Sequence, residues 1–243
     1  MNQKDTMSAL PTGTVTFLFT DIEGSTNLWE EFPEAMKAAL AKHDSILKEA
    51  VESNHGQIVK TTGDGIHAVF TTAIDAINAA IQSQHKLNSL ILNYELPITN
   101  LQSPISSLSL KSRMGLHAGE AELREGDYFG QTLNRAARIM SAGHGGQILI
   151  SDIVAQVASE HLSAGVSFLE LGEHYLKGVV QAEKIYQIVA LNLQKDFPPL
   201  NSIPTATNNL PTQLTSFIGR ERELNDASEK LESAKLLTLI GPG

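Results

Sequence analysis

TVTFLFTD, residues 14–21, is the stretch that decides how this chain folds. Its apolar and β-branched residues run without interruption from 14 to 20, between Gly13 and the turn Asp21-Ile22-Glu23-Gly24. A run of this length and composition predicts a strand that is buried on both faces. Asp21 stands at the carboxyl end of that strand, so its side chain is expected at one edge of a sheet.

Downstream of this strand the apolar residues change to helical spacing. Pro33 occupies the first position of the predicted helix, and the spacing continues to the stop at Asn54-His55-Gly56. Residues 57–62 and 66–70 are two short β-prone runs separated by Gly63-Asp64-Gly65, and an Asp-Gly pair in this position is a strong hairpin signal. Asp64 is therefore expected at the tip of a hairpin.

The remaining periodic segments complete the order βαββαβ, followed by a further helix. Helical spacing covers 73–94, a strand is predicted over 113–121, and a helix over 131–142 is ended by Gly143. This order predicts an α+β fold with a ferredoxin-like core, in which two helices cover one face of an antiparallel sheet. Additional elements are expected as a short helix near 152–160 and strands over 147–150, 166–171 and 184–191.

Composition divides the chain into segments. Prolines gather with Ser, Thr and Asn from Phe197 to Pro211, which predicts a linker. The expected segments are a tail over 1–12, the main domain over 13–193, the linker over 194–215 and the start of a second domain over 216–243. That last segment ends in a strand and Gly241-Pro242-Gly243, as a phosphate-binding loop begins, and the chain stops before the lysine of such a loop. The aperiodic stretch 96–110 is expected to be a mobile insertion.

Charge and residue usage narrow the class of protein. The formal net charge of −9 argues against a nucleic-acid surface, which needs clustered Lys and Arg. The chain has no cysteine, and its eight histidines show no metal-ligand spacing, so they are interpreted as packing or surface residues. No stretch approaches the roughly 20 apolar residues that span a bilayer, so a cytoplasmic protein without membrane contact is expected. Trp29 is expected to anchor the core.

Asp21 and Asp64 are candidate metal ligands. Magnesium prefers hard oxygen ligands, often one or two carboxylates together with waters and substrate phosphates. If the first strand and the hairpin are neighbours in the sheet, both carboxylates emerge at one edge. Each aspartate alone has a structural explanation of equal weight, because Asp is common at strand ends and in Asp-Gly turns. The adjacent Gly24-Ser25-Thr26 either caps a helix or presents backbone amides to a triphosphate.

A second polar group lies further along the chain. Asn134 and Arg138 are four residues apart on a predicted helix, hence on one face, where the guanidinium could stabilise charge on a phosphate. The alternative is a surface arginine with an amide neighbour. Lys60 has a similar alternative, as a solvated charge on a strand, and Arg135 is interpreted as solvated.

Four motifs in this order resemble those of the class III nucleotidyl cyclases, the adenylyl and guanylyl cyclases. The resemblance runs from about Thr14 to Val189 and implies the class III cyclase fold for the catalytic domain at 13–193. Its motifs are FTDIEGST at 19–26, KTTGDG at 60–65, MGLHAGE at 114–120 and DYFGQTLNRAAR at 127–138. The residues from Asn209 resemble the start of an NTPase domain in large bacterial regulators with an N-terminal cyclase domain.

The resemblance implies a role for each candidate residue. Two ions, Mg²⁺ or Mn²⁺, would be held by Asp21 and Asp64, with the backbone carbonyl of Ile22 as a further ligand. The other implied roles are purine reading by Lys60 and Asp127, ribose orientation by Asn134, transition-state stabilisation by Arg138 and phosphate binding by Lys177. An ammonium and a carboxylate match the N1 acceptor and 6-amino donor of adenine and mismatch guanine, so ATP is favoured over GTP.

The implied reaction converts ATP to 3′,5′-cyclic AMP and pyrophosphate. In this family the site lies between two protomers, one giving the metal aspartates and the other the purine and transition-state residues, so a head-to-tail homodimer is expected. One alternative is a catalytically silent dimerisation or nucleotide-sensing module that regulates C-terminal domains. Another is a diguanylate cyclase, which is disfavoured because the chain lacks a Gly-Gly-Asp/Glu-Glu-Phe turn.

Overall fold

The structure is a computed structural model, and it divides the chain into two units, Met1–Thr205 and Ala206–Gly243. The residues that it describes are 9–90, 92–93, 107–108, 110–179, 181–204, 225–226, 228–230 and 238. In the second unit, 225–226 and 228–230 are helical and exposed. Apart from these residues and residue 238, the expected NTPase start at 216–243 lies outside the described residues, as do most of the insertion at 96–110 and the first eight residues.

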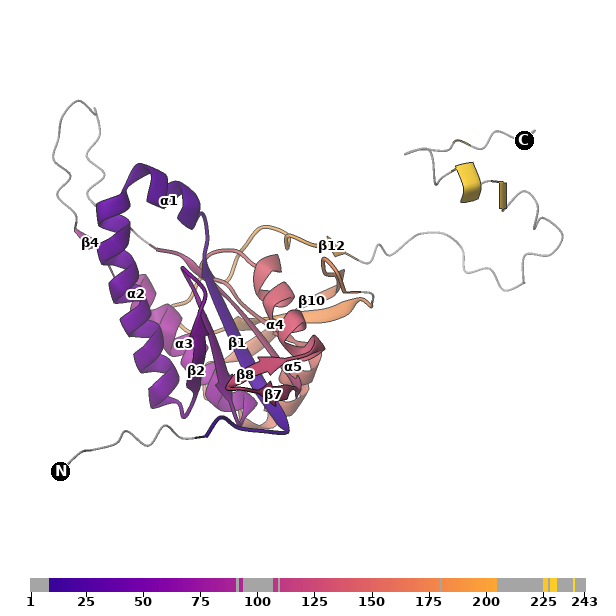
Figure 1. Ribbon diagram of the computed structural model, residues 1–243, viewed down its shortest axis with the longest axis horizontal. Coiled ribbons are helices and arrows are strands. Elements are labelled where there is room, and N and C mark those ends of the chain that lie inside the picture. The colour runs from indigo at the N-terminus through magenta and orange to yellow at the C-terminus, as the bar shows by residue number, and fades with distance from the viewer. Residues whose placement is uncertain are drawn as a thin grey trace. The chain divides into compact units, whose positions relative to one another are not determined.

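The first unit is built on an eight-stranded sheet with the order β12-β10-β11-β9-β6-β1-β3-β2 (Figure 1). Its strands are β1 (Thr14–Ile22), β2 (Gln57–Thr61), β3 (Ile66–Phe70), β6 (Ser112–Glu120), β9 (Ile148–Ser151), β10 (Ser167–Tyr175), β11 (Glu183–Val189) and β12 (Ile203–Pro204). The apolar run that opened the sequence is the central strand β1, antiparallel to both β3 and β6. β6 and β9 pair in parallel. The predicted α+β fold with a ferredoxin-like core is confirmed.

Helices cover both faces of this sheet. The helices are α1 (Ser25–Glu31), α2 (Pro33–Ser53), α3 (Ala73–Ser89), α4 (Gln131–Ala142), α5 (Asp152–Ala158) and the 3₁₀ turn η1 (Ser159–His161). Leu18 of β1 packs with residues of α2, α3 and α5, whereas its neighbour Phe17 packs with Ala136 of α4 on the other face. Because successive side chains of a strand alternate, the continuous apolar run of β1 serves both layers. Trp29 is 38% exposed on α1, which buries none of its residues, so its predicted core position is wrong.

Several boundaries differ from the sequence-based prediction. Helix α3 ends at Ser89 instead of continuing to 94, and a two-stranded pair, β4 (Leu92–Asn93) with β5 (Ser107–Leu108), follows it. A hairpin that sequence reasoning missed joins β7 (Glu122–Arg124) to β8 (Asp127–Phe129). Its two turn residues, Glu125 and Gly126, both have positive φ angles, 49° and 82°. This turn places Asp127 at the start of β8.

The predicted linker at 194–215 begins with a segment that belongs to the first unit and packs on its sheet and on α4. The backbone N–H of Asn201 donates to the Ala142 carbonyl at 2.9 Å, and Gln187 Nε2 donates to the Lys195 carbonyl at 2.7 Å. Strand β12 then pairs with β10. These contacts satisfy backbone groups that a free linker would leave to water, so the first unit extends past the predicted boundary at 193.

No helix within the described ranges is long and apolar enough to cross a membrane.

Candidate active site

The hairpin between β2 and β3 packs its tip against the end of β1. A Cβ atom on Gly65 would lie 1.8 Å from the Thr20 carbonyl oxygen, so only glycine allows this approach. The hydroxyl of Thr20 accepts a hydrogen bond from the backbone N–H of Ile66 at 3.0 Å. These contacts hold Asp64, the residue before Gly65, beside Asp21, the residue after Thr20. The expectation that strand and hairpin are neighbours is confirmed.

Asp21 lies within β1, which extends two residues beyond the predicted run, and its side chain is 24% exposed. Burial raises the pKa of this carboxyl above its usual value, the Arg113 guanidinium opposes that rise, and the nearby Asp64 carboxylate adds to it. Arg113 donates to Asp21 Oδ2 from Nε at 2.8 Å and from Nη2 at 2.5 Å. Asp21 is thus one member of a pair of adjacent carboxylates, with the Arg113 guanidinium as its counter-ion.

This donor set fits a divalent cation whose coordination is completed by a substrate. Two hard carboxylates lie together, as Mg²⁺ sites of this kind require. The described residues contain no cluster of three or more His, Cys, Asp or Glu that would form a complete protein cage. Ile22 ends β1 with its side chain buried beside Met36 and Leu110, so only its backbone is available to the site. Its carbonyl remains a predicted ligand.

The turn after β1 begins with Gly24 in the left-handed conformation, φ 70°, ahead of α1. Ser25 and Thr26 are the first residues of that helix, and no side chain caps it. Thr26 is exposed and Ser25 is partly exposed. This turn follows the Asp21 carboxylate directly, so the three residues stay candidate contacts for a triphosphate.

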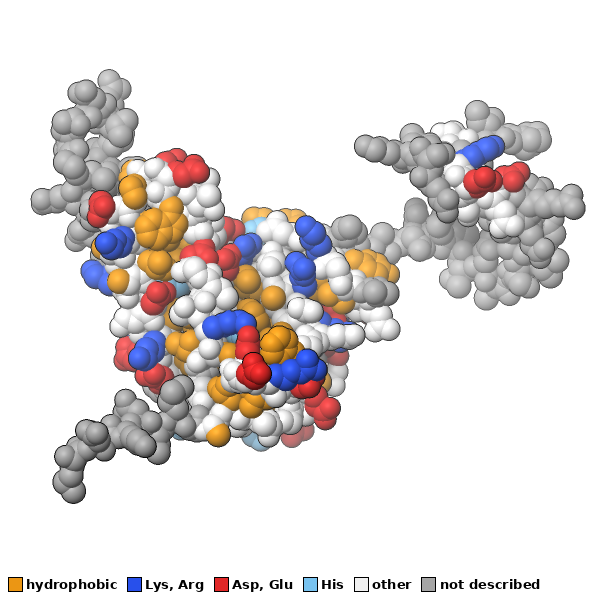
Figure 2. Space-filling view, in the orientation of Figure 1, with side chains coloured by type: hydrophobic (Ala, Val, Ile, Leu, Met, Phe, Trp, Pro, Cys, Tyr) orange, Lys and Arg blue, Asp and Glu red, His pale blue; other side chains and the backbone are white. Residues whose placement is uncertain are grey.

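Lys60 and Asp127, 67 residues apart, form an ion pair of 2.5 Å between Nζ and Oδ2. Lys60 is on the edge strand β2 and Asp127 on the β7–β8 hairpin, and their side chains are 47% and 34% exposed. The hydrogen bond from Lys60 lowers the pKa of Asp127, and the backbone N–H of Tyr128 assists by donating to Oδ1 at 2.8 Å. Asp127 is therefore a carboxylate, a hydrogen-bond acceptor, at neutral pH. Figure 2 shows basic and acidic side chains side by side over hydrophobic ones on this face.

An aromatic cluster formed by Phe17, Phe19, His67 and Tyr128 lies next to this pair. The fully buried His67 ring stacks on Phe19, with centroids 4.4 Å apart and planes 17° apart. Neither ring nitrogen has a hydrogen-bond partner in the described part of the chain. Burial, with the Lys60 charge assisting, lowers the pKa of His67 to about 4, against a smaller opposing effect of Asp127. His67 is a neutral packing residue, as the sequence predicted for the histidines.

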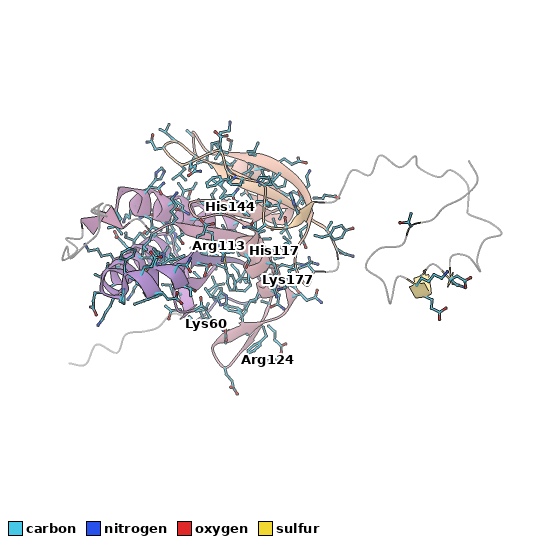
Figure 3. All side chains as sticks on the ribbon, turned by 90° about the horizontal axis from the view of Figure 1, so that it is seen from above. Lys60, Arg113, His117, Arg124, His144 and Lys177 are labelled. Atoms are coloured by element: carbon cyan, nitrogen blue, oxygen red, sulfur yellow. The ribbon has the colours of Figure 1, made fainter. Side chains whose placement is uncertain are left out.

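Asn134 and Arg138 project from α4 toward the loop between β10 and β11. Asn134 lines a pocket of about 370 Å³ together with Gln131, Arg135, Gly178, Val179 and Gln181. An Arg138 Nη2 atom would lie 4.0 Å from a Cβ atom built on Gly178. Lys177, labelled in Figure 3, precedes that glycine and is exposed. The loop therefore brings the candidate phosphate lysine close to the α4 pair.

Arg135 does not belong to the solvated class that the sequence suggested. Its Nε atom lies 3.1 Å from a carboxylate oxygen of Glu183 on β11, and the two side chains are 32% and 12% exposed. α4 packs so closely on the sheet that a Cβ atom on Gly115 of β6 would lie 2.3 Å from the Met140 backbone nitrogen. α4 therefore lies close enough to the sheet for Arg135 to pair with Glu183.

The candidate residues thus form three groups: the carboxylates of Asp21 and Asp64, the Lys60–Asp127 pair, and the α4 pair. Across the described residues, no hydrogen bond or ion pair joins the carboxylate group to the other two. Sequence reasoning missed Arg113 as a partner of Asp21. The sequence indicated only that Arg113 lies on a strand. The register that places it opposite Asp21 cannot be predicted from local sequence.

Residues 7–190 match the family profile described as the adenylate and guanylate cyclase catalytic domain. An uncharacterized protein of Mycobacterium tuberculosis (strain ATCC 25618 / H37Rv) is 35% identical over 219 residues, covering 88% of this chain and 70% of that protein. An adenylate cyclase of Podospora anserina is 35% identical over 161 residues, which is 60% of this chain and 8% of that protein.

Solved structures give the same result for the fold. Adenylate cyclases from Trypanosoma brucei in their monomeric state superpose with a TM-score of 0.65 at 28% identity, covering 80% of this chain and 95% of theirs. An adenylate/guanylate cyclase/hydrolase from Silicibacter pomeroyi superposes with a TM-score of 0.60 at 28% identity, covering 72% of this chain and 96% of its own.

Proposed function

This chain belongs to the family of adenylate and guanylate cyclase catalytic domains, and from that premise we propose that it converts ATP to 3′,5′-cyclic AMP and pyrophosphate. The observation that carries the choice of ATP is the Lys60–Asp127 ion pair. Adenine presents an acceptor at N1 and a donor at its 6-amino group, which the ammonium and the carboxylate match. Guanine presents a carbonyl and a ring N–H instead, and an unpaired polar group in a recognition site discriminates strongly.

The lowered pKa of Asp127 supports this assignment, because only the ionised carboxyl accepts from the 6-amino group without competing as a donor. In the free protein, Lys60 and Asp127 are hydrogen-bonded to each other. When adenine binds, each member exchanges its partner for a base atom of the same polarity. Phe19, the partly exposed member of the adjacent aromatic cluster, gives the base an apolar neighbour.

The carboxylates of Asp21 and Asp64 would hold two ions, Mg²⁺ or Mn²⁺, which when bound supply charge neutralisation at the triphosphate. Asn134 orients the ribose with its amide, so that the 3′-hydroxyl faces the α-phosphorus. The bond from O3′ to the α-phosphorus forms as the bond from the α-phosphorus to the bridging oxygen of the β-phosphate breaks; pyrophosphate leaves with that oxygen, and the hydroxyl proton passes to water. Arg138 stabilises the charge that develops on the transferring phosphoryl group, and Lys177 contacts the leaving phosphates.

The site is proposed to lie between two copies of the chain in a head-to-tail homodimer with two equivalent sites. In the described part of one chain, no hydrogen bond or ion pair joins the carboxylate group to the other two groups, and an arrangement that draws them from two chains is compatible with this. In each site, Asp21 and Asp64 come from one protomer, and the purine pair and the α4 pair come from the other.

The test is a product assay on the purified chain with ATP and GTP in parallel, in Mg²⁺ or Mn²⁺, across protein concentration. We expect cyclic AMP from ATP, with a specific activity that rises with protein concentration as dimers form. Tight ATP binding without any product would favour the silent nucleotide-sensing module instead. Predominant formation of cyclic GMP would overturn the assignment of the purine pair.

A further inference from the structure

Residues 195–204 form a strap that follows β11, contacts α4 and ends in the edge strand β12 (Figure 1). The strap lies beyond residue 190, where the match to the family profile ends, and the second unit follows it from Ala206. Most of its described side chains are exposed, and Phe197 and Leu200 line a cavity of about 460 Å³ beneath it. A segment with exposed side chains and loose packing opens at a lower free energy than the core.

Residues 143–147 form the turn between α4 and β9, a bridging turn that contacts the strap on one side. The Nε2 atom of His144, labelled in Figure 3, donates to the Pro199 carbonyl at 3.0 Å. The His144 side chain is only 16% exposed. A Cβ atom built on Gly146 would lie 3.9 Å from the Phe197 ring. The middle of the strap is thus held in place by the bridging turn.

The other side of the bridging turn packs against residues 21–24, the Asp21 turn. Nδ1 of His144 lies 3.7 Å from a carboxylate oxygen of Glu23. A Cβ atom on Gly145 would lie 2.5 Å from Lys111 Cβ and 2.9 Å from Glu23 Oε2, so only glycine allows this approach. The bridging turn therefore lies between the strap and the Asp21 turn, in contact with both.

Lys111 orients a peptide group that the proposed function uses. The backbone N–H of Glu23 donates to the Lys111 carbonyl at 3.0 Å. That N–H and the Ile22 carbonyl, a predicted metal ligand, belong to one planar trans peptide unit and point in opposite directions. A hydrogen bond that fixes the N–H therefore also fixes the direction of the carbonyl. A continuous series of contacts thus joins the strap to a predicted ligand.

We propose that the strap positions the Asp21 turn through His144, so that seating of the strap and binding of the metal ion are coupled. The inference rests on the metal role in the proposed function. When the strap leaves, His144 loses its partner at Pro199, and the bridging turn no longer holds Lys111 and Glu23 in one arrangement. Coupling between two sites is reciprocal, so a bound ion also holds the strap in place by the same factor.

The experiment measures two quantities in the full chain with 2′,3′-dideoxy-ATP, which lacks the attacking hydroxyl. Mn²⁺ affinity is measured by electron paramagnetic resonance of the free ion. Seating of the strap is measured by amide hydrogen exchange of residues 194–204, followed by mass spectrometry with and without Mn²⁺. In the wild type we expect Mn²⁺ to slow this exchange about 5-fold or more.

Three variants of histidine test the role of His144. His144→Ala should abolish the slowing by Mn²⁺ and weaken Mn²⁺ affinity about 5-fold or more. His144→Gln should keep most of both effects, because its side-chain amide nitrogen replaces Nε2 as the donor. His161→Ala is the matched control: it removes an exposed histidine of η1, and neither quantity should change.

Asn201→Pro tests the strap from its own side. It removes the backbone N–H that donates to the Ala142 carbonyl and leaves the bridging turn unchanged. Mn²⁺ affinity should fall about as far as in His144→Ala, and in the double variant the two losses should not add, because both act on one series of contacts. An unchanged Mn²⁺ affinity in Asn201→Pro would overturn the coupling, and this variant carries the test if His144→Ala does not fold.

The outcomes separate this inference from the proposed function. If Asp21→Asn binds Mn²⁺ as tightly as the wild type, the metal assignment fails and the coupling fails with it. If Asp21→Asn loses the ion while Mn²⁺ leaves the exchange of the wild-type strap unchanged, or still slows it in His144→Ala, only the coupling is overturned. Circular dichroism and thermal unfolding report the folding of each variant.

Discussion

Asp21 and Asp127 are both paired with a cation, yet their pKa values move in opposite directions. The pKa of Asp21 is raised by burial in spite of Arg113, whereas the pKa of Asp127 is lowered by Lys60. Asp21 belongs to the central strand and has a second carboxylate beside it. Asp127 belongs to an exposed hairpin and has a backbone N–H as a second donor.

The difference shows that an ion pair does not by itself stabilise a carboxylate. Desolvation and like charge outweigh the guanidinium at Asp21, and neither is strong at Asp127. The negative charge of the carboxylate group is therefore not fully neutralised by Arg113, and a bound cation would stabilise it. At the Lys60–Asp127 pair the two charges neutralise each other, so the pair can exchange its hydrogen bond for hydrogen bonds to a neutral base.

The largest effect is expected from neutralising one of the carboxylates of Asp21 and Asp64. Asp21→Asn or Asp64→Asn keeps the shape of the side chain and removes one of the two charges that hold the ions. We expect kcat for cyclic AMP formation to fall by about 10³-fold or more, a loss comparable to removing one transition-state contact. A product assay at saturating ATP and Mn²⁺ measures this, and retained turnover would contradict the metal role.

The next largest effect is expected from removing Asp127 from the Lys60–Asp127 pair. Asp127→Ala removes the acceptor for the 6-amino group, and we expect kcat/KM for ATP to fall about 10²-fold while the preference for ATP over GTP is lost. Glu122→Gln is the control, because Glu122 pairs with Arg124 on the same hairpin and is exposed. A variant that kept its preference for ATP would show that other residues read the base.

A third effect tests the aromatic cluster next to the Lys60–Asp127 pair. The folded-state pKa of His67, about 4, lies below the value of 6.5 for a free histidine. As the pH falls below 6.5, His67 becomes protonated in the unfolded chain but stays neutral in the folded chain. The free energy of unfolding therefore decreases down to about pH 4 and then levels off. For this fully buried ring the loss is on the order of 3 kcal/mol.

His67→Leu should remove that loss and, because neither ring nitrogen has a partner in the described residues, should not destabilise the protein at pH 7. His117→Leu is the comparison: the pKa of His117 is also lowered to about 4, but its Nδ1 is 2.8 Å from the Ser151 hydroxyl. That variant should be less stable at pH 7. Urea unfolding between pH 4 and 7 measures both, and an unchanged acid loss in His67→Leu would count against the assignment.

The smallest effect is a difference in stability between variants that neutralise Asp21 and Asp127. In metal-free protein at pH 7, neutralising a carboxyl whose folded pKa is raised should stabilise the fold, and neutralising one whose pKa is lowered should destabilise it. We therefore expect Asp21→Asn to raise Tm and Asp127→Asn to lower it, each by no more than a few degrees. Two shifts of the same sign in EDTA would show that the opposite pKa shifts do not govern stability.

The sequence by itself determined the elements whose signals are local. The apolar run of β1, the hairpin with Asp64 at its tip, and α4 with Asn134 and Arg138 four residues apart all appear in the predicted places. Each of these depends on residue spacing or on turn chemistry within a few positions. The β7–β8 hairpin was missed because its turn, Glu125-Gly126, is not one of the strong hairpin pairs.

Only the tertiary structure decided which side chains meet. Asp21 meets Arg113, 92 residues away, through the register of two strands, and Lys60 meets Asp127 through the placement of a hairpin beside an edge strand. Arg135 pairs with Glu183 because α4 packs closely on the sheet. Periodicity in a sequence reports which face of an element is buried, but the partner across that face depends on how distant elements are aligned. The two aspartates could be identified from their turns, and the arginine that holds one of them could not.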